Sequence, residues 1–262
     1  MIFVLSINYQ IRLKAVTIDD FSYSNKLTIG TELSWKLTTF SVEPEESKEE
    51  YRFVIKEGQN MIEGDIFKVK ILQNLNNLNL DNSRSLYSTD LQWGEFFLNS
   101  ASLGKNPSEI NWYGPAIEIG MIINVPIIPT TLQLSTGEKN YFDYLEEYFE
   151  ALSEEESEGF SVKNAANSFS MKLKMKGDFS IFANVQFESE LETTYNKEWG
   201  VLSRYELNEK ITKAEETIQA KIVYEIENSE IQVPYSWIYS FVAIFIAGIA
   251  VLSKRKKVSN LK

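Results

Sequence analysis

The strongest constraint on this chain is an uncharged stretch near its C-terminus, which runs from Ile231 to Ser253. Its 23 residues separate Glu230 from Lys254, and the part from Trp237 to Leu252 is almost entirely apolar. A helix of about 20 apolar residues, rising 1.5 Å per residue, crosses the roughly 30 Å hydrocarbon layer of a bilayer. A buried core helix would instead need apolar neighbours on every side. The sequence therefore predicts a single C-terminal transmembrane helix at 231–253.

The residues beside this stretch predict which way it crosses the membrane. Basic residues next to a span stay on the cytoplasmic side, whereas Trp and Tyr favour the headgroup level. A basic tail follows the apolar part and aromatic residues lie at its other end: Lys254, Arg255, Lys256 and Lys257 against Tyr235, Trp237 and Tyr239. We therefore expect the tail, 254–262, in the cytoplasm and the N-terminal domain outside it, at the cell membrane.

Small residues recur along one face of the predicted span, at Ser240, Ala243, Ala247 and Ala250. Small side chains let two helices approach closely in lipid, so this face suits packing against another transmembrane helix, including a copy of itself. The alternative, that the bilayer simply tolerates Ala and Ser there, stays open. The expected partners are thus the lipid bilayer and, beyond it, another span or surface protein.

The part of the chain before the tail is strongly acidic. The net charge is −11, with 26 Lys and Arg against 37 Asp and Glu. Five of the basic residues lie in the tail and every acidic residue lies before it, so the remainder carries 21 − 37 = −16. Such a surface repels nucleic acid, which is therefore not an expected partner.

Residue types on which many enzymes depend are missing. The sequence has no Cys and no His, which excludes disulfides, thiol catalysis, the Ser-His-Asp triad and most zinc sites. It also lacks a glycine loop for nucleotide phosphates. The acidic runs at 43–50 and 154–158 are interpreted as solvated faces, and weak Ca²⁺ binding there stays open. We therefore expect no catalytic activity and no cofactor.

The first residues leave two interpretations open. A domain outside the cytoplasm needs an export signal, but the apolar run at 1–7 is short and lacks a basic start. Either the true start lies upstream, so that 1–17 holds the remnant of a signal peptide, or the domain is cytoplasmic and tail-anchored, against the charge rule. Residues 7–15 also alternate as a first strand would.

Alternating apolar and polar residues predict a mainly β domain (α+β) built from antiparallel strands. In its first half, 18–135, strands are expected around Trp35 and over 51–56, 67–71 and 91–98, and an irregular segment over 100–115. In its second half, 136–230, a meander of four strands is expected over 169–175, 181–191, 201–211 and 218–226. Gly200 is expected at positive φ in the hairpin before the third of these. Whether the halves form one sheet or two lobes stays open.

One amphipathic helix precedes the meander. Its apolar residues Tyr141, Leu145, Tyr148, Phe149 and Leu152 fall on a single helical stripe, and Asn140 is a suitable N-cap. We expect a curved sheet with this helix covering its apolar face. Aromatic residues of this helix and of the irregular segment define a candidate apolar binding patch: Trp93, Trp112, Tyr113, Tyr148 and Phe149. Ordinary core packing is the alternative explanation of these aromatic residues.

Three segments are similar to motifs of a known group: Gly30–Leu37, Pro126–Thr130 and the hairpin Tyr195–Leu202. In these segments the chain resembles archaeal single-pass surface proteins of the choice-of-anchor type. Asn196 and Trp199 depart from the hairpin of that group, which reads Tyr-Asp-x-x-Thr-Gly-x-Leu. The resemblance implies an export signal, a β-rich ectodomain and one C-terminal span, and it implies no particular chemistry.

Two functions follow as expectations. The first is a membrane-anchored extracytoplasmic binding or structural surface protein without catalytic activity. The second is a carrier or chaperone that holds a lipid or other apolar ligand between sheet and helix, and it requires an open cavity there.

Overall fold

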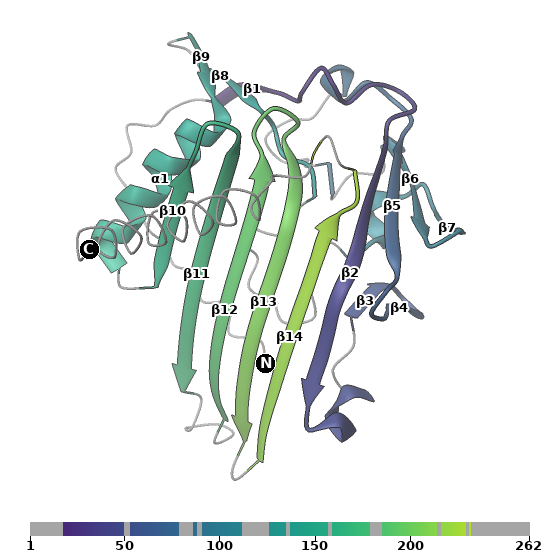
Figure 1. The fold of residues 1–262 in the computed structure, drawn as a ribbon. Coiled ribbons are helices and arrows are strands. Elements are labelled where there is room, and N and C mark those ends of the chain that lie inside the picture. Colours follow the sequence, from purple (N-terminus) through teal and green to yellow (C-terminus); the bar gives the residue numbers. More distant parts are fainter. Residues whose placement is uncertain are drawn as a thin grey trace, which may run out of the picture. The chain divides into compact units, whose positions relative to one another are not determined.

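The alternating segments of the sequence form one antiparallel sheet of nine strands in the computed structural model (Figure 1). The structure describes residues 18–49, 53–78, 86–87, 91–111, 126–134, 137–156, 159–178, 185–213, 216–228 and 231. The strands lie in the order β10 (Phe160–Asn164), β11 (Ser168–Asp178), β12 (Val185–Asn196), β13 (Val201–Lys213), β14 (Glu216–Ile226), β2 (Glu32–Glu43), β5 (Ile66–Ile71), β6 (Gly94–Leu98) and β7 (Ala101–Gly104). Since β14 pairs with β2, the two halves of the sequence share one sheet.

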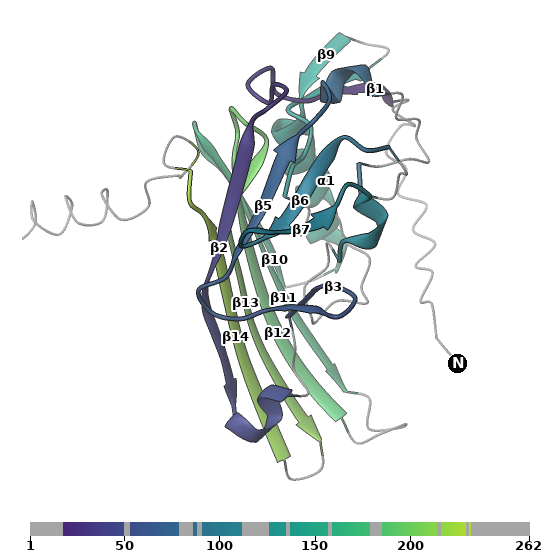
Figure 2. The ribbon, with the colours of Figure 1, turned by 90° about the vertical axis from the view of Figure 1, so that its right-hand side faces the viewer.

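Shorter elements complete the described part of the chain. One small sheet contains β1 (Ile18–Ser22), β8 (Thr131–Leu134) and β9 (Gly137–Asn140), and another contains β3 (Phe53–Lys56) and β4 (Gln59–Met61). Three 3₁₀ turns lie at η1 (Glu45–Glu49), η2 (Leu75–Asn77) and η3 (Pro107–Glu109). In Figure 2, α1 (Tyr141–Glu156), β1 and β3 lie on the same side of the long strands.

The nine-stranded sheet has one apolar face and one polar face, because successive residues of a strand point to opposite sides. Side chains on the apolar face are buried in the core, among them Trp35, Phe96, Phe169, Leu207 and Ile222. Lysine and glutamate alternate with them on the other face, so the sheet has a solvated side. The predicted inward position of Trp35 is confirmed: it is fully buried, and its Nε1 donates to the carbonyl oxygen of Leu202 at 2.7 Å.

The predicted amphipathic helix is confirmed as α1. The Oδ1 of Asn140 accepts a hydrogen bond from the backbone N–H of Phe142 at 2.9 Å, so Asn140 caps the helix as expected. Phe142 lies against Phe169 of β11, with ring centroids 5.4 Å apart. The helix therefore packs on the apolar face at the β10–β11 end of the sheet.

Several short elements differ from the sequence-based expectation. The segment expected to be irregular, 100–115, contains the edge strand β7, and β8, β9 and β10 were not expected at all. The acidic run at 43–50 is partly η1 rather than an open loop. These elements have four or five residues each, too few for a periodic pattern to distinguish a strand from a turn.

The contacts divide the chain into two units, 1–231 and 232–262. Within the described residues, no helix is both long enough and apolar enough to cross a membrane. Apart from Ile231, the predicted span at 231–253 and the basic tail at 254–262 lie outside the described residues, as does the segment 1–17.

Candidate functional site

The polar face of the long strands is hollowed at the end where β11 and β13 finish. Two adjoining hollows of about 490 and 350 Å³ cross β11, β12 and β13, and the larger one extends to β14 and β2. Lys176, Glu188 and Lys210 line both of them. We call this surface the polar trough. It is the candidate site for a binding partner.

The trough is lined by charges of opposite sign on neighbouring strands. Lys172 and Lys174 of β11 both reach Glu190 of β12, at 2.5 and 3.1 Å, and Lys176 reaches Glu188 at 3.0 Å. These pairs follow from strand register, which sets Lys174 opposite Glu190 and Lys176 opposite Glu188. These ion pairs were not predicted from the sequence. Lys at every second position of one strand and Glu at every second position of the next strand would have indicated them.

A second charged cluster lies higher on the same face and is centred on Glu206. Its carboxylate accepts hydrogen bonds from Arg204 at 2.7 Å, Lys221 at 2.8 Å and Asn208 at 3.3 Å. Arg204 also pairs with Glu225 of β14. Burial raises the pKa of Glu206, but the hydrogen bonds from Lys221, Arg204 and Asn208 outweigh that effect and hold it at about 2. This cluster therefore links β13 to β14 through a carboxylate that is charged at neutral pH.

On this face, the pKa values of the shifted glutamates are lowered and that of the shifted lysine is raised, so all of them move farther from neutral pH. Hydrogen bonds from lysine lower the pKa of Glu188 and of Glu190, and the hydrogen bond to Glu190 raises the pKa of Lys172. A general acid or base works best with a pKa near the working pH, so these groups are tuned as fixed charges instead. Such an arrangement can orient a polar partner but is poorly suited to move protons.

The apolar face carries three buried hydroxyl groups, on Ser189, Thr193 and Tyr205. Among the described residues, none of the three has a hydrogen-bond partner. Thr193 and Tyr205 face each other across β12 and β13 and are 0% and 1% exposed. A buried hydroxyl without a partner costs about 1–3 kcal/mol, so these groups are either a cost to the core or a contact point for a ligand.

The candidate aromatic patch is divided by the fold where its residues are described. Trp93 is fully buried beside β6, and its Nε1 donates to the carbonyl oxygen of Leu86 at 2.6 Å. Phe149 stacks on Phe160 of β10 at 4.5 Å between ring centroids, and Tyr148 packs edge-on against Phe149 at 5.2 Å. β6 and β10 lie near opposite ends of the strand order, so Trp93 does not join Tyr148 and Phe149. Trp112 and Tyr113 lie outside the described residues.

Other predicted site residues also fall outside what the structure describes. These are the proposed membrane anchor residues Tyr235, Trp237, Tyr239, Lys254, Arg255, Lys256 and Lys257, and the small-residue face Ser240, Ala243, Ala247 and Ala250. Across the described ranges, no group of three or more Asp and Glu side chains is arranged to hold a metal ion.

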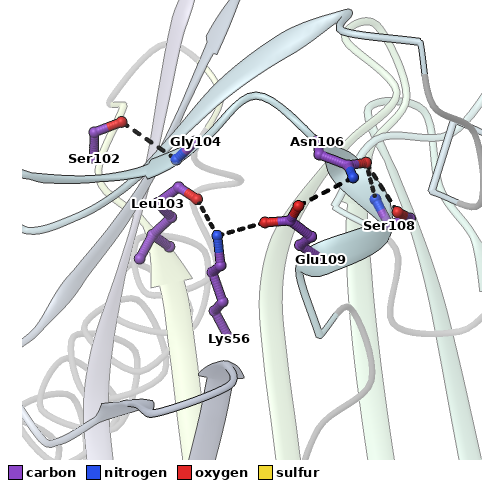
Figure 3. A network of polar contacts seen from close by, with 7 residues as sticks. All are labelled: Lys56, Ser102, Leu103, Gly104, Asn106, Ser108 and Glu109. Atoms are coloured by element: carbon purple, nitrogen blue, oxygen red, sulfur yellow. Dashed lines mark hydrogen bonds and ion pairs between the residues drawn. The ribbon is translucent and has the colours of Figure 1, made fainter.

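One edge of the nine-stranded sheet is closed by a polar network (Figure 3). Lys56 of β3 donates from its Nζ to the carbonyl oxygen of Leu103 in β7 and to Glu109, at 2.6 Å each. Asn106 donates to the same carboxylate at 3.2 Å, and the hydrogen bonds from Lys56 and Asn106 lower the pKa of Glu109. Because the Lys56 side chain covers a carbonyl oxygen of this edge strand, the network disfavours edge-to-edge association of β7.

Neither protein-family models, nor curated proteins, nor solved structures give a match to this chain.

Proposed function

We propose that this chain is a membrane-anchored surface protein, exposed outside the cytoplasm, that binds a partner or forms part of a surface assembly without catalysing a reaction. The observation that carries the proposal is the polar trough, a hollow across five long strands that contains ion pairs between β11 and β12. Fixed charges of both signs at set spacings recognise a polar surface by complementarity.

The sequence of the second unit supports the membrane anchor. The uncharged stretch at 231–253 has the length of a bilayer span, and four basic residues follow it directly. Small residues on one face of that span favour a further partner, another transmembrane helix or a copy of the same one.

Cysteine labelling tests both the anchor and its orientation, since the natural sequence has no cysteine. Lys210→Cys places a thiol in the polar trough, and Ser259→Cys places one in the basic tail. In intact cells, a membrane-impermeant maleimide should label the first variant and should reach the second only after lysis. Labelling of the tail alone in intact cells would contradict the proposed orientation, and release of the protein by alkaline carbonate would contradict the anchor.

The carrier function remains the second candidate, because of the hydroxyl groups on Ser189, Thr193 and Tyr205. A ligand with an apolar body and a polar group would satisfy them while lying on the apolar face. The tight aromatic packing of α1 on β10 and β11 supports the first proposal instead, since those rings occupy space that a cavity would need. Native mass spectrometry of the full chain in mild detergent distinguishes the two: the first proposal expects the mass of the protein alone, and the carrier expects a retained lipid.

A further inference from the structure

The point at which the chain leaves the first unit is fixed by hydrogen bonds. Ile231 is 2% exposed, its N–H donates to the carbonyl oxygen of Asn228 at 2.9 Å, and its own carbonyl oxygen accepts from Nδ2 of Asn196 at 3.1 Å. Asn196 begins the turn between β12 and β13. Ile231 is also the first residue of the uncharged stretch. The chain therefore leaves this unit beside the β12–β13 turn.

The loop before β2 lies at the same end of the sheet as that turn. Ser24 donates from its Oγ to the carbonyl oxygen of Glu198 at 2.7 Å, and Lys26 pairs with the carboxylate of Glu198 at 2.8 Å. Farther along the loop, the N–H of Gly30 donates to the carbonyl oxygen of Ile71, the last residue of β5, at 2.8 Å. Figure 1 shows this loop and the β12–β13 turn at one end of the long strands. We call this surface, residues 24–30 and 196–200, the exit end.

The exit end presents the kinds of side chain that favour a lipid headgroup layer. Ile29 is 67% exposed, although it is a large aliphatic residue. Trp199 is partly buried, and the ammonium group of Lys26 lies 5.1 Å from its ring centroid. An exposed aliphatic residue at the same end of the sheet as a tryptophan and a lysine is the composition of an interfacial contact, in which the apolar parts enter the headgroup region and the charges stay in water.

The charge of the exit end also permits a close approach to lipid. Its charged side chains are Lys26, Lys197 and Glu198, and Lys197 also pairs with the carboxylate of Asp143 at 3.8 Å, so this end is close to neutral, whereas the chain before the tail carries −16. A strongly acidic surface would be repelled from anionic lipid, but this end would not be.

We infer that the exit end rests on the outer surface of the bilayer, with Ile29 inserted at the level of the headgroups. This inference depends on the proposed membrane anchor, because it is the anchor that brings this end to the lipid. The docked end leaves the polar trough pointing away from the membrane: Lys210 lies nine residues along β13 from Val201, or roughly 30 Å at 3.3 Å per residue. The partner of the exit end is thus the lipid itself, and the partner of the trough binds farther out.

Single cysteines in the full chain test the contact, and the sequence offers a matched control. Among the residues that the structure describes, Ile29 and Ile62 are the two exposed large aliphatic ones, at 67% and 62%. Ile62 lies in the turn before β5, where the N–H of Gly64 donates to Leu37 in the middle of β2, away from the exit end. The variants Ile29→Cys, Ile62→Cys and Lys210→Cys would each carry a fluorescent label, in phosphatidylcholine vesicles with and without a quencher attached to the lipid headgroup.

We expect headgroup quenching to remove most of the fluorescence at position 29 and to leave positions 62 and 210 nearly unchanged. Flotation of the same vesicles on a density gradient reports separately whether the chain is anchored. If the chain floats and the three labels are quenched equally, the exit end does not rest on lipid, although the anchor stands. If the chain does not float, both the anchor and this inference fail.

Discussion

At the scale of single residues, the hydroxyl of Thr193 distinguishes the two candidate functions. It is fully buried on the apolar face without a hydrogen-bond partner among the described residues. If nothing binds there, Thr193→Val replaces a polar group with an apolar one of the same shape. The free energy of unfolding should then rise by about 1 kcal/mol, measured by urea denaturation. A loss of stability together with loss of a co-purified lipid would favour the carrier.

Ser203 provides the control for that substitution. Its hydroxyl is also buried, but its Oγ donates to the carbonyl oxygen of Thr194 at 3.0 Å. Ser203→Ala should therefore lower the free energy of unfolding by about 1 kcal/mol, because a satisfied hydrogen bond is lost. Opposite signs for the two variants would show that the hydroxyl of Thr193 is a cost to the folded core.

Glu206 should give the polar face an acid-sensitive contribution to stability. Its pKa is held at about 2, against an ordinary value of 4.5, since the hydrogen bonds from Lys221 and Arg204 exceed the effect of burial. A lowered pKa stabilises the fold above pH 4.5, and that stabilisation is lost as the pH falls from 4.5 toward 2. Glu206→Gln should lower the free energy of unfolding at neutral pH by about 1–2 kcal/mol, after allowance for solvent screening.

Glu188 provides the control for the substitution of Glu206. Glu188 is on the same face and pairs with Lys176 at 3.0 Å, but its side chain is 56% exposed. Glu188→Gln should change stability much less than Glu206→Gln, because water screens an exposed pair. Chemical denaturation of both variants from pH 7 down to pH 2 should show the Glu206 difference shrinking with acid. A difference independent of pH would mean that the glutamine disturbs packing rather than charge.

At the scale of elements, the turn between β12 and β13 depends on a glycine that the sequence identified. Gly200 has a φ of +64°, and a Cβ there would lie 2.3 Å from the carbonyl oxygen of Ile128. The carbonyl oxygen of Gly200 also accepts from the N–H of Ile128 at 2.7 Å. Gly200→Ala combines a left-handed backbone with a clash, so thermal denaturation should show a loss of about 2–3 kcal/mol.

Gly58 separates the two causes of that loss. It has a φ of +74° in the β3–β4 turn, and a Cβ there would meet nothing within 4 Å. Gly58→Ala should cost about 1 kcal/mol, from the backbone alone. If both alanine variants lose the same stability, the close approach of Ile128 contributes nothing.

The elements that could be predicted from the sequence are those with enough residues to show a period. Strands β5, β11, β13 and β14 were each expected within a few residues of their ends, because their apolar and polar side chains alternate, whereas only the first half of β2, around Trp35, was expected. The helix was expected from its stripe and from the cap at Asn140. The short strands β7 to β10 were missed, since four or five residues that are polar or mixed are compatible with a turn as well as a strand.

At the scale of the whole molecule, neither the pairing of β14 with β2 nor the polar trough could be predicted from the sequence. Residues such as Ile222 and Phe40 face each other across this pair although they lie far apart in the chain, and alternation says nothing about which strand lies next to which. The opposition of Lys176 to Glu188 depends on the register of β11 and β12, which alternation alone does not give. The composition gives the net charge and shows that Cys and His are missing. Which lysine lies opposite which glutamate in the trough depends on the strand register.

The core as a whole should be sensitive to alkali, because many of its aromatic residues are tyrosines. Burial raises the pKa of six of them: Tyr23, Tyr87, Tyr141, Tyr195, Tyr205 and Tyr224. A raised pKa stabilises the fold fully below the ordinary value of 10.0, and that stability is lost as the unfolded tyrosines ionise above it. Each contributes about 1.4 kcal/mol per pH unit, or about 8 kcal/mol for the six.

A domain stable by about 5–15 kcal/mol should therefore unfold cooperatively within about two pH units above 10. Circular dichroism should be lost in a single step during an alkaline titration, and the tyrosinate absorbance of the six buried side chains, a part of the signal from the 13 tyrosines, should appear in that same step. Tyr205→Phe removes one of the six groups, so its stability should fall less steeply with pH above 10. Ionisation of all 13 tyrosines before any loss of circular dichroism would mean that the six buried side chains ionise within the folded state, and it would contradict this prediction.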